Sequence, residues 1–292
     1  GLPDALQRVV GKALDGEVLS PQEAHRLAGA APEHLVALCR AASLVRDRGK
    51  GHNITFSPKV FIPLTRLCRD SCGYCTFRQS PQETTQPYME LEDVLDVARA
   101  GERMGCSEAL FTLGERPEQR YPEARAWLAG RGYGSTLDYL HDACQMVLEE
   151  TTLLPHINPG TMGRGEMARL REASASMGMM LESTSPRLGG PGGPHELSPS
   201  KRPHARTNTL ETAGEMKVPF TTGILVGIGE TPAERVESLL AIRELQGRYG
   251  HIQEVIVQGF LPKAGTVMEG HPGPAMEELL WTVAIARLIL GP

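Results

Sequence analysis

The sequence predicts an α/β fold in which six parallel strands form an open, partial (β/α)6 barrel of the TIM type. From about residue 56 onwards, short apolar segments alternate with longer amphipathic ones, a pattern typical of alternating strands and helices. Right-handed crossovers make such a series a parallel sheet. A closed barrel needs eight units, whereas this chain offers six, so we expect the barrel to stay open.

Six short apolar segments are the candidate strands. They span residues 59–63, 107–113, 153–157, 179–183, 220–226 and 254–260. The candidate helices are amphipathic segments at 91–104, 135–149, 165–177, 206–216, 232–245 and 275–290. Because functional loops of parallel α/β proteins lie at the carboxyl ends of the strands, we expect the site there.

The first 52 residues predict a helical extension, separate from a barrel domain at residues 53–292. Ser20 is a candidate helix N-cap, followed by Pro21 in the first turn and by Glu23 as the partner of a capping box. The chain begins with Gly1 and stops at Pro292, directly after an amphipathic segment. We therefore expect a domain excised from a longer protein and truncated at its C-terminus.

The composition favours a small-molecule substrate. The net charge is -5, and no cluster of Lys and Arg offers the basic face that a nucleic acid requires, so we expect no nucleic-acid partner. The apolar stretches at 224–228 and 279–290 are too short to cross a bilayer. Three of the six cysteines crowd into eight residues, which favours a reducing, cytoplasmic compartment over a disulfide framework.

A long segment between the fourth strand and the next helix is rich in breaking residues. Residues 185–203 contain five prolines and four glycines, and few apolar side chains that could pack as a regular element. We expect a lid or a flexible loop here.

The crowded cysteines, Cys68, Cys72 and Cys75, follow the first candidate strand. Their spacing lets one compact loop present three thiolates, the usual ligands of iron-sulfur clusters. A 4Fe-4S cube normally takes four thiolates, so three leave one iron open to a bound molecule. The alternatives are a zinc site or a closed electron-transfer cluster, each of which needs a fourth ligand such as Cys106. We consider Cys106 a small core residue instead.

This spacing, with the aromatic Tyr74 before the last cysteine, resembles the signature of radical S-adenosylmethionine (SAM) enzymes. The resemblance implies a 4Fe-4S cluster on the three cysteines and SAM bound to its open iron. An electron from the reduced cluster would then cleave SAM to a 5'-deoxyadenosyl radical that abstracts hydrogen. It also implies an electron donor, whose acidic surface Arg66 and Arg69 could meet, although solvated arginines are the simpler explanation.

The same resemblance implies further cofactor contacts. Gly114 and Glu115 follow the second strand, where the family contacts the methionyl amine, although Leu113 replaces the first glycine of the usual motif. Glu182 and Ser183 end the fourth candidate strand, at the position that meets the ribose; a helix cap is the alternative. Gly227 lies in a glycine-containing segment like the one that follows the adenine, where glycine allows close approach. With Tyr74, these are the candidate cofactor-binding residues.

Three longer strings narrow the family. They are IPLTRLC at 62–68, LPHINPG at 154–160 and PFTTGIL at 219–225, and they resemble the CofG-type half of 7,8-didemethyl-8-hydroxy-5-deazariboflavin (FO) synthase, the amino-terminal part of fused, FbiC-type actinobacterial proteins. This resemblance implies a fused CofH-type partner half that joins tyrosine to 5-amino-6-(D-ribitylamino)uracil. The CofG-type half then forms FO, a precursor of factor 420, by hydrogen abstraction, ring closure and ammonia release.

Polar residues at or near strand ends are the candidate substrate contacts, although each could equally be a satisfied polar group of the core. They are His156, Asn158, Thr221, Thr222 and Gln258. Lys201, Arg202, His204 and Arg206, beyond the proline-rich segment, rank lower because exposed basic residues are usually solvated. Two other functions stay open: a biotin-synthase-like or aminofutalosine-type radical SAM enzyme, and a non-catalytic iron-sulfur electron-transfer module.

Overall fold

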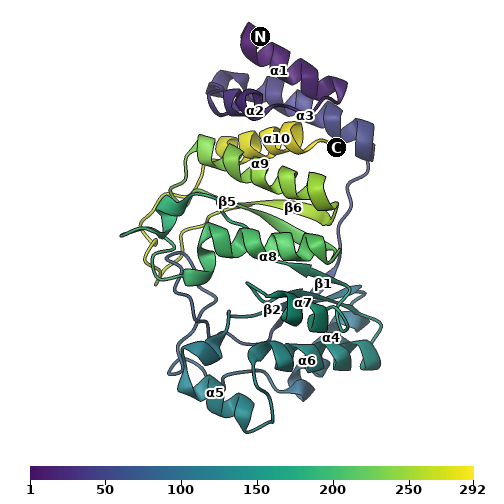
Figure 1. Cartoon of the computed structure of the whole chain (residues 1–292), viewed down its shortest axis with the longest axis vertical. Coiled ribbons are helices and arrows are strands. Elements are labelled where there is room, and N and C mark those ends of the chain that lie inside the picture. The colour runs from purple at the N-terminus through teal and green to yellow at the C-terminus, as the bar shows by residue number, and fades with distance from the viewer.

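The computed structural model describes residues 1–292 and begins with three helices. These are α1 (Asp4–Asp15), α2 (Pro21–Ala28) and α3 (Leu35–Lys50). The Ser20 hydroxyl accepts the Glu23 N–H, and the Glu23 carboxylate accepts the Ser20 N–H, which confirms the capping box. Figure 1 shows the three helices stacked at one end of the molecule, next to both termini.

The barrel contains one parallel sheet of six strands in sequence order. The strands are β1 (Lys59–Pro63), β2 (Glu108–Thr112), β3 (Leu154–Asn158), β4 (Ser176–Gly178), β5 (Phe220–Val226) and β6 (Ile252–Gly259). All neighbouring pairs are parallel, and β1 and β6 lie at opposite edges of the sheet without pairing. The predicted open, partial barrel is confirmed.

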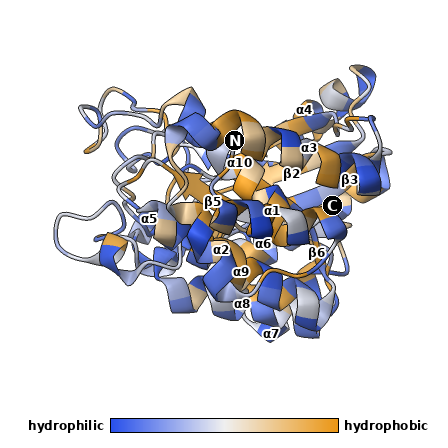
Figure 2. Cartoon of the chain, turned by 90° about the horizontal axis from the view of Figure 1, so that it is seen from above, coloured by the Kyte–Doolittle hydropathy of each residue, from blue (hydrophilic) through white to orange (hydrophobic).

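Seven further helices lie between and after the strands in the sequence. They are α4 (Leu91–Arg103), α5 (Pro122–Ala129), α6 (Thr136–Glu150), α7 (Arg164–Leu170), α8 (Pro203–Glu215), α9 (Pro232–Tyr249) and α10 (Met276–Leu290). The sequence pattern did not indicate α5. Apolar residues gather on the strands and on α10, whereas the visible faces of α2 and α7 are mainly hydrophilic (Figure 2).

The N-terminal helices pack onto the barrel through α3 against α10 and α2 against α9. One hydrophobic core runs from Leu6 and Leu38 in these helices to Ile62 and Phe220 in the strands. The division between residues 52 and 53 falls in the segment that joins α3 to β1, and it stays a prediction. None of the helices is both long enough and apolar enough to cross a membrane.

Two predicted elements around the fourth strand are wrong. The helix expected to reach residue 177 ends at Leu170, and β4 is Ser176–Gly178 instead of 179–183. Residues 179–182 still run beside β5, but the Leu181 N–H bonds to the Thr222 hydroxyl instead of a backbone carbonyl. Glu182 then adopts φ 65°, a left-handed conformation that ends the extended chain.

Alternation along the strands separates the helix-facing side chains from those inside the barrel. Ile62 is fully buried and Val60 packs against Gly101 of α4, so both face the helices. Phe61 therefore points into the space enclosed by the curved sheet, because successive strand residues face opposite sides. We call this space the lumen. It opens between the two edge strands.

Candidate functional site

A cavity of about 180 Å³ lies at the carboxyl ends of the first strands, where the sequence placed the site. All three clustered cysteines line it. Its other lining residues are Asp70, Tyr74, Phe77, Arg78, Thr112, Leu113, Gly114, Glu115, Asn158, Gly160, Met180, Glu182, Lys201 and Arg206. The cavity thus combines thiols, carboxylates and cations in one partly enclosed space.

The loop that carries the cysteines lies directly on the segment after β2. Gly114 donates its N–H to the Thr65 carbonyl at 2.9 Å, and Arg69 donates to the Glu115 carbonyl at 2.7 Å. A Cβ atom on Gly114 would lie 1.9 Å from the Leu67 carbonyl oxygen, so this close approach requires glycine. The Glu115 N–H donates to the Cys68 sulfur at 3.2 Å. Gly114 therefore positions the cysteine loop.

The proline-rich segment, predicted as a lid or flexible loop, packs against the cysteine loop. We call residues 185–202 the crossing segment. Its Leu197 and Pro194 carbonyls accept the N–H groups of Ser71 at 3.0 Å and Gly73 at 2.8 Å. Two short 3-10 turns, Pro186–Gly189 and Pro199–Lys201, give it regular structure. Backbone hydrogen bonds to the cysteine loop and the buried side chain of Leu188 hold this segment in place, and its flexibility stays a prediction.

Tyr74 joins the cysteine loop to the crossing segment. Its hydroxyl lies 3.0 Å from Nε2 of His195, and the two rings meet edge to face. Burial raises the pKa of Tyr74 well above its ordinary value. Burial, reinforced by the Lys201 charge, lowers the pKa of His195 to about 4. The pair is therefore uncharged at neutral pH and acts as a hydrogen-bonded contact inside the site.

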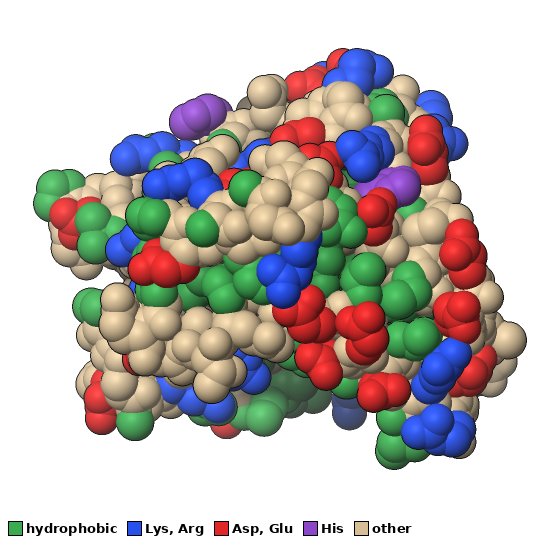
Figure 3. All heavy atoms as spheres, turned by 90° about the horizontal axis from the view of Figure 1, so that it is seen from below, with side chains coloured by type: hydrophobic (Ala, Val, Ile, Leu, Met, Phe, Trp, Pro, Cys, Tyr) green, Lys and Arg blue, Asp and Glu red, His purple; other side chains and the backbone are tan.

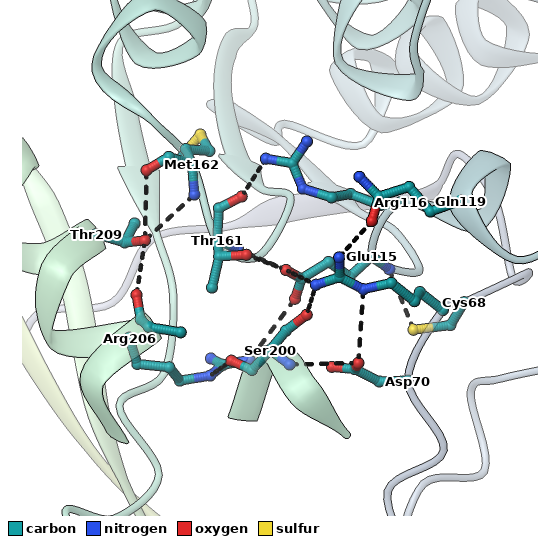
Figure 4. A network of polar contacts seen from close by, with 12 residues as sticks. Cys68, Asp70, Glu115, Arg116, Gln119, Thr161, Met162, Ser200, Arg206 and Thr209 are labelled. Atoms are coloured by element: carbon teal, nitrogen blue, oxygen red, sulfur yellow. Dashed lines mark hydrogen bonds and ion pairs between the residues drawn. The ribbon is translucent and has the colours of Figure 1, made fainter. Parts of the chain in front are cut away.

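Glu115 is the centre of a polar network beside Cys68 (Figure 4). Its carboxylate accepts the N–H of Thr161 at 3.0 Å and also the Thr161 hydroxyl. The guanidinium groups of Arg69 and Arg206 lie 3.6 and 4.0 Å from it. Glu115 is 5% exposed. These donors and cations offset the free-energy cost of removing its carboxylate from water.

Glu182 forms a second buried acid-base pair in the cavity. Its carboxylate accepts a hydrogen bond from Lys201. Burial alone raises the pKa of Glu182, but the charges of Lys201 and Arg206 outweigh it and leave the pKa below its usual value. Glu182 is therefore a carboxylate, and the cavity wall contains a negative and a positive group side by side.

The structure brings together four of the six candidate cofactor residues. Tyr74, Gly114, Glu115 and Glu182 line the cavity. Ser183 and Gly227 do not line it. The Ser183 hydroxyl accepts the Ser185 N–H, and Gly227, with φ 94°, packs against Pro274.

The candidate substrate residues separate in the same way. Asn158 lines the cavity. His156 lies two residues before Asn158 on the same strand, and its Nδ1 is 2.7 Å from the Ser176 hydroxyl. Thr221 faces Glu254 across neighbouring strands, and Gln258 is exposed on β6. Thr222 points to the helix side of β5, where it satisfies the Leu181 N–H.

Sequence reasoning ranked Lys201 and Arg206 low among the candidate contacts, yet both line the cavity. Both belong to the basic run at the end of the proline-rich segment, a pattern that predicts solvated surface residues. Arg206 is 4% exposed and donates to the Ser200 and Met180 carbonyls. Only the fold of the crossing segment brings these cations inward. On the face shown in Figure 3, by contrast, basic and acidic side chains are intermixed.

The three thiols suit a cluster better than a single ion. No three His, Cys, Asp or Glu side chains converge closely enough to hold one metal ion, whereas each thiolate of an iron-sulfur cube binds a separate iron. Donors already point at two of the sulfurs: the Glu115 N–H at Cys68 and the Ser198 hydroxyl at Cys72. Hydrogen bonds of this kind stabilise thiolate ligands. The donor set therefore fits an iron-sulfur cluster.

Comparison with known proteins agrees with this geometry. The model of the radical SAM superfamily matches residues 62–242. The FO synthase of Nocardia farcinica is 51% identical over 300 residues, which cover 99% of this chain and 35% of that protein. The 7,8-didemethyl-8-hydroxy-5-deazariboflavin synthase of Methanopyrus kandleri is 55% identical over 237 residues, which cover 81% of this chain and 71% of that protein.

Solved structures show the same fold at low identity. The FeFe-hydrogenase maturase HydG of Carboxydothermus hydrogenoformans superposes with a TM-score of 0.78 at 22% identity, over 98% of this chain and 63% of that one. Methylornithine synthase (PylB) gives 0.73 at 21% identity, over 96% and 76%. The chain spans about a third of the length of the FO synthases that it matches. By sequence it belongs to the radical SAM superfamily and, within it, to the family of 7,8-didemethyl-8-hydroxy-5-deazariboflavin synthases.

Proposed function

We propose that this chain is the CofG-type radical SAM half of FO synthesis. Its substrate would be the adduct of tyrosine and 5-amino-6-(D-ribitylamino)uracil, from which it abstracts hydrogen, closes the central ring and releases ammonia. The observation that carries the proposal is the cavity in which three cysteines lie with three buried carboxylates and three cationic side chains, in a chain 55% identical to a synthase of this product.

Cys68, Cys72 and Cys75 would hold three irons of a 4Fe-4S cluster, and SAM would bind the fourth. The bound pair supplies the radical chemistry that ring closure at an unactivated carbon requires. The protein supplies binding, orientation and exclusion of water. The crossing segment contributes to exclusion because it covers the cysteine loop with backbone hydrogen bonds.

The charges in the cavity suit the methionyl end of SAM, which carries an ammonium and a carboxylate. Glu115 and Glu182 offer two buried carboxylates, and Lys201 and Arg206 offer two cations. A zwitterion placed between them would pair each of its charges with an opposite one, which a desolvated ligand requires.

The partners follow from the same assignment. We propose a CofH-type radical SAM half, fused in the full-length protein, because this chain covers 35% of the FO synthase of Nocardia farcinica. An electron donor must reduce the cluster. All six cysteines are free thiols, which suits a reducing, cytoplasmic location.

The test is anaerobic reconstitution of the cluster, followed by SAM, tyrosine, the ribityl uracil and the CofH-type half. We expect a fluorescent deazaflavin and 5'-deoxyadenosine, and Cys72→Ala should abolish both. Cys39→Ala, on α3 far from the cavity, is the matched control and should retain both. Deoxyadenosine without deazaflavin would assign another substrate. If the magnetic resonance spectrum of the reduced cluster does not change with SAM, the chain is not a radical SAM enzyme.

A further inference from the structure

Phe61 is an aromatic residue that the hydrophobic core does not use. It lies in the middle of β1, yet 48% of its surface is exposed, whereas the next residue, Ile62, is fully buried. Because it faces the lumen, its ring is open to the inside of the barrel and not to the outer surface. An exposed aromatic ring inside a barrel is available to a ligand.

Phe61 is connected to the cysteine cavity through Phe77. The two rings meet edge to face with their centroids 6.2 Å apart, and Phe77 lines the cavity. On Phe77, the Arg66 guanidinium carbon lies 5.7 Å from the ring centre. Neither phenylalanine belongs to the hydrophobic core. The pair therefore forms an aromatic surface that extends from the cavity into the lumen.

Strand register places this surface one row below the cavity. Pro63 pairs with Thr112, which pairs with Asn158, and the last two residues line the cavity. The next lumen-facing row contains Phe61, Leu110, His156 and Ser176, in neighbouring strands. A molecule that reacts in the cavity and extends into the lumen must pass the exposed ring of Phe61.

We propose that Phe61, supported by Phe77, stacks against a planar heteroaromatic ring of the substrate and thereby fixes its position below the cysteine cavity. The inference rests on the proposed function, whose substrate carries a phenol and a pyrimidine ring. A flat ring binds more tightly beside an aromatic side chain, because stacking adds binding free energy to that from the burial of apolar area. In the same row, His156 is buried and its Nδ1 lies 2.7 Å from the Ser176 hydroxyl, so Phe61 is the exposed side chain of this row.

The test uses FO itself as the probe, with its fluorescence anisotropy as the measure of binding to the reconstituted full chain. Phe61→Leu keeps apolar volume but removes the ring, and we expect it to raise the Kd for FO by about tenfold, the effect of losing one stacked ring. Phe61→Trp keeps a stacking surface and should bind within about threefold of the wild type. Phe56→Leu is the matched control, because Phe56 is 87% exposed in the segment before β1.

Equal affinity of the wild type and Phe61→Leu overturns the inference, as does a wild type that fails to bind FO. An equal loss in the leucine and tryptophan variants also overturns it, because it would show that Phe61 only braces Phe77 and the cysteine loop. The proposed function fails in a different way. A wild type that binds FO but makes none with its partner half contradicts the reaction, not the stacking surface.

Discussion

The fully buried Ser198 hydroxyl donates a hydrogen bond to the sulfur of Cys72, with 3.3 Å between oxygen and sulfur. The crossing segment is therefore not only a cover for the cysteine loop. It provides a hydrogen-bond donor to one of the three proposed cluster ligands, while the Glu115 N–H provides one to Cys68. Donors to ligand sulfurs stabilise the more negative, reduced state of a cluster and so raise its reduction potential.

Ser198→Ala should lower the midpoint potential of the reconstituted cluster by about 40 mV. This value corresponds to one hydrogen bond of about 1 kcal/mol in a one-electron couple. Potentiometric titration followed by magnetic resonance measures it, with iron content as the check on loading. Ser174→Ala is the control, since the Ser174 hydroxyl bonds within its own segment to the Leu170 carbonyl. An unchanged potential in a fully loaded Ser198→Ala variant would show that this contact does not act on the cluster.

Gly114→Ala should prevent normal assembly of the cysteine loop. The added Cβ would lie 1.9 Å from the Leu67 carbonyl oxygen and 2.9 Å from Cβ of Cys68, so the loop must move away from β2. We expect a sharp loss of iron bound on reconstitution, together with a lower thermal midpoint.

Gly247→Ala is the matched control for this clash. Gly247 lies in α9 with no atom within 4 Å of an added Cβ, so alanine should stabilise the chain by roughly 0.5–1 kcal/mol. Iron content should stay at the wild-type level. Equal iron loading of the two alanine variants would contradict a positioning role for Gly114.

The sequence predicted most of this barrel but could not predict its fourth strand. β1 and β5 have the expected bounds, because each is a mainly apolar segment that a proline directly precedes. The end of β4 depends instead on the Thr222 hydroxyl, which replaces a backbone acceptor, and on the left-handed Glu182. Both are tertiary features of a segment whose apolar pattern continues unchanged.

In the site, too, the features set by local sequence were predictable and those set by tertiary contacts were not. Cysteine spacing is local, so it identified the loop at the cavity. The pairing of Lys201 with Glu182, and of Arg206 with Glu115, joins residues far apart in sequence. It depends on the path of a segment whose prolines and glycines indicate only the absence of a helix or strand. Nothing in the basic run itself separates Arg206, which is buried, from His204, which is exposed.

Glu230→Gln should destabilise the chain by about 3–5 kcal/mol, the usual cost of breaking a buried ion pair. The Glu230 carboxylate, 1% exposed, lies 2.6 Å from Nε of Arg235. It also accepts the N–H groups of Gly227 and Ile228 at 2.8 and 2.9 Å, so it fixes the turn after β5. Urea unfolding measures the change in free energy. Glu237→Gln, at an exposed position on α9, the helix that carries Arg235, should stay within about 0.5 kcal/mol of the wild type. A similarly small effect for Glu230→Gln would mean that water or a local rearrangement compensates for the lost Glu230–Arg235 ion pair.

His156→Gln should make the free energy of unfolding less sensitive to acid. Burial, together with the charge of Lys59, lowers the pKa of His156 to about 4, below its unfolded value of about 6.5. As the pH falls through this window, the unfolded chain takes up a proton that the folded chain does not, so folded-state stability is lost. Between about pH 7 and about pH 4.5 this histidine accounts for a loss of roughly 2–3 kcal/mol, which the glutamine variant should not show.

Urea unfolding at the two pH values gives the measurement, and His204→Gln, at an exposed position on α8, is the control that should behave like the wild type. His195 also has a pKa of about 4, so His156→Gln should retain part of the acid sensitivity instead of removing all of it. An equal loss of unfolding free energy between the two pH values in the wild type and in His156→Gln would mean that His156 is protonated in the folded barrel. A charged imidazole in the lumen would then present a cation to the substrate, in place of the neutral group bonded to Ser176.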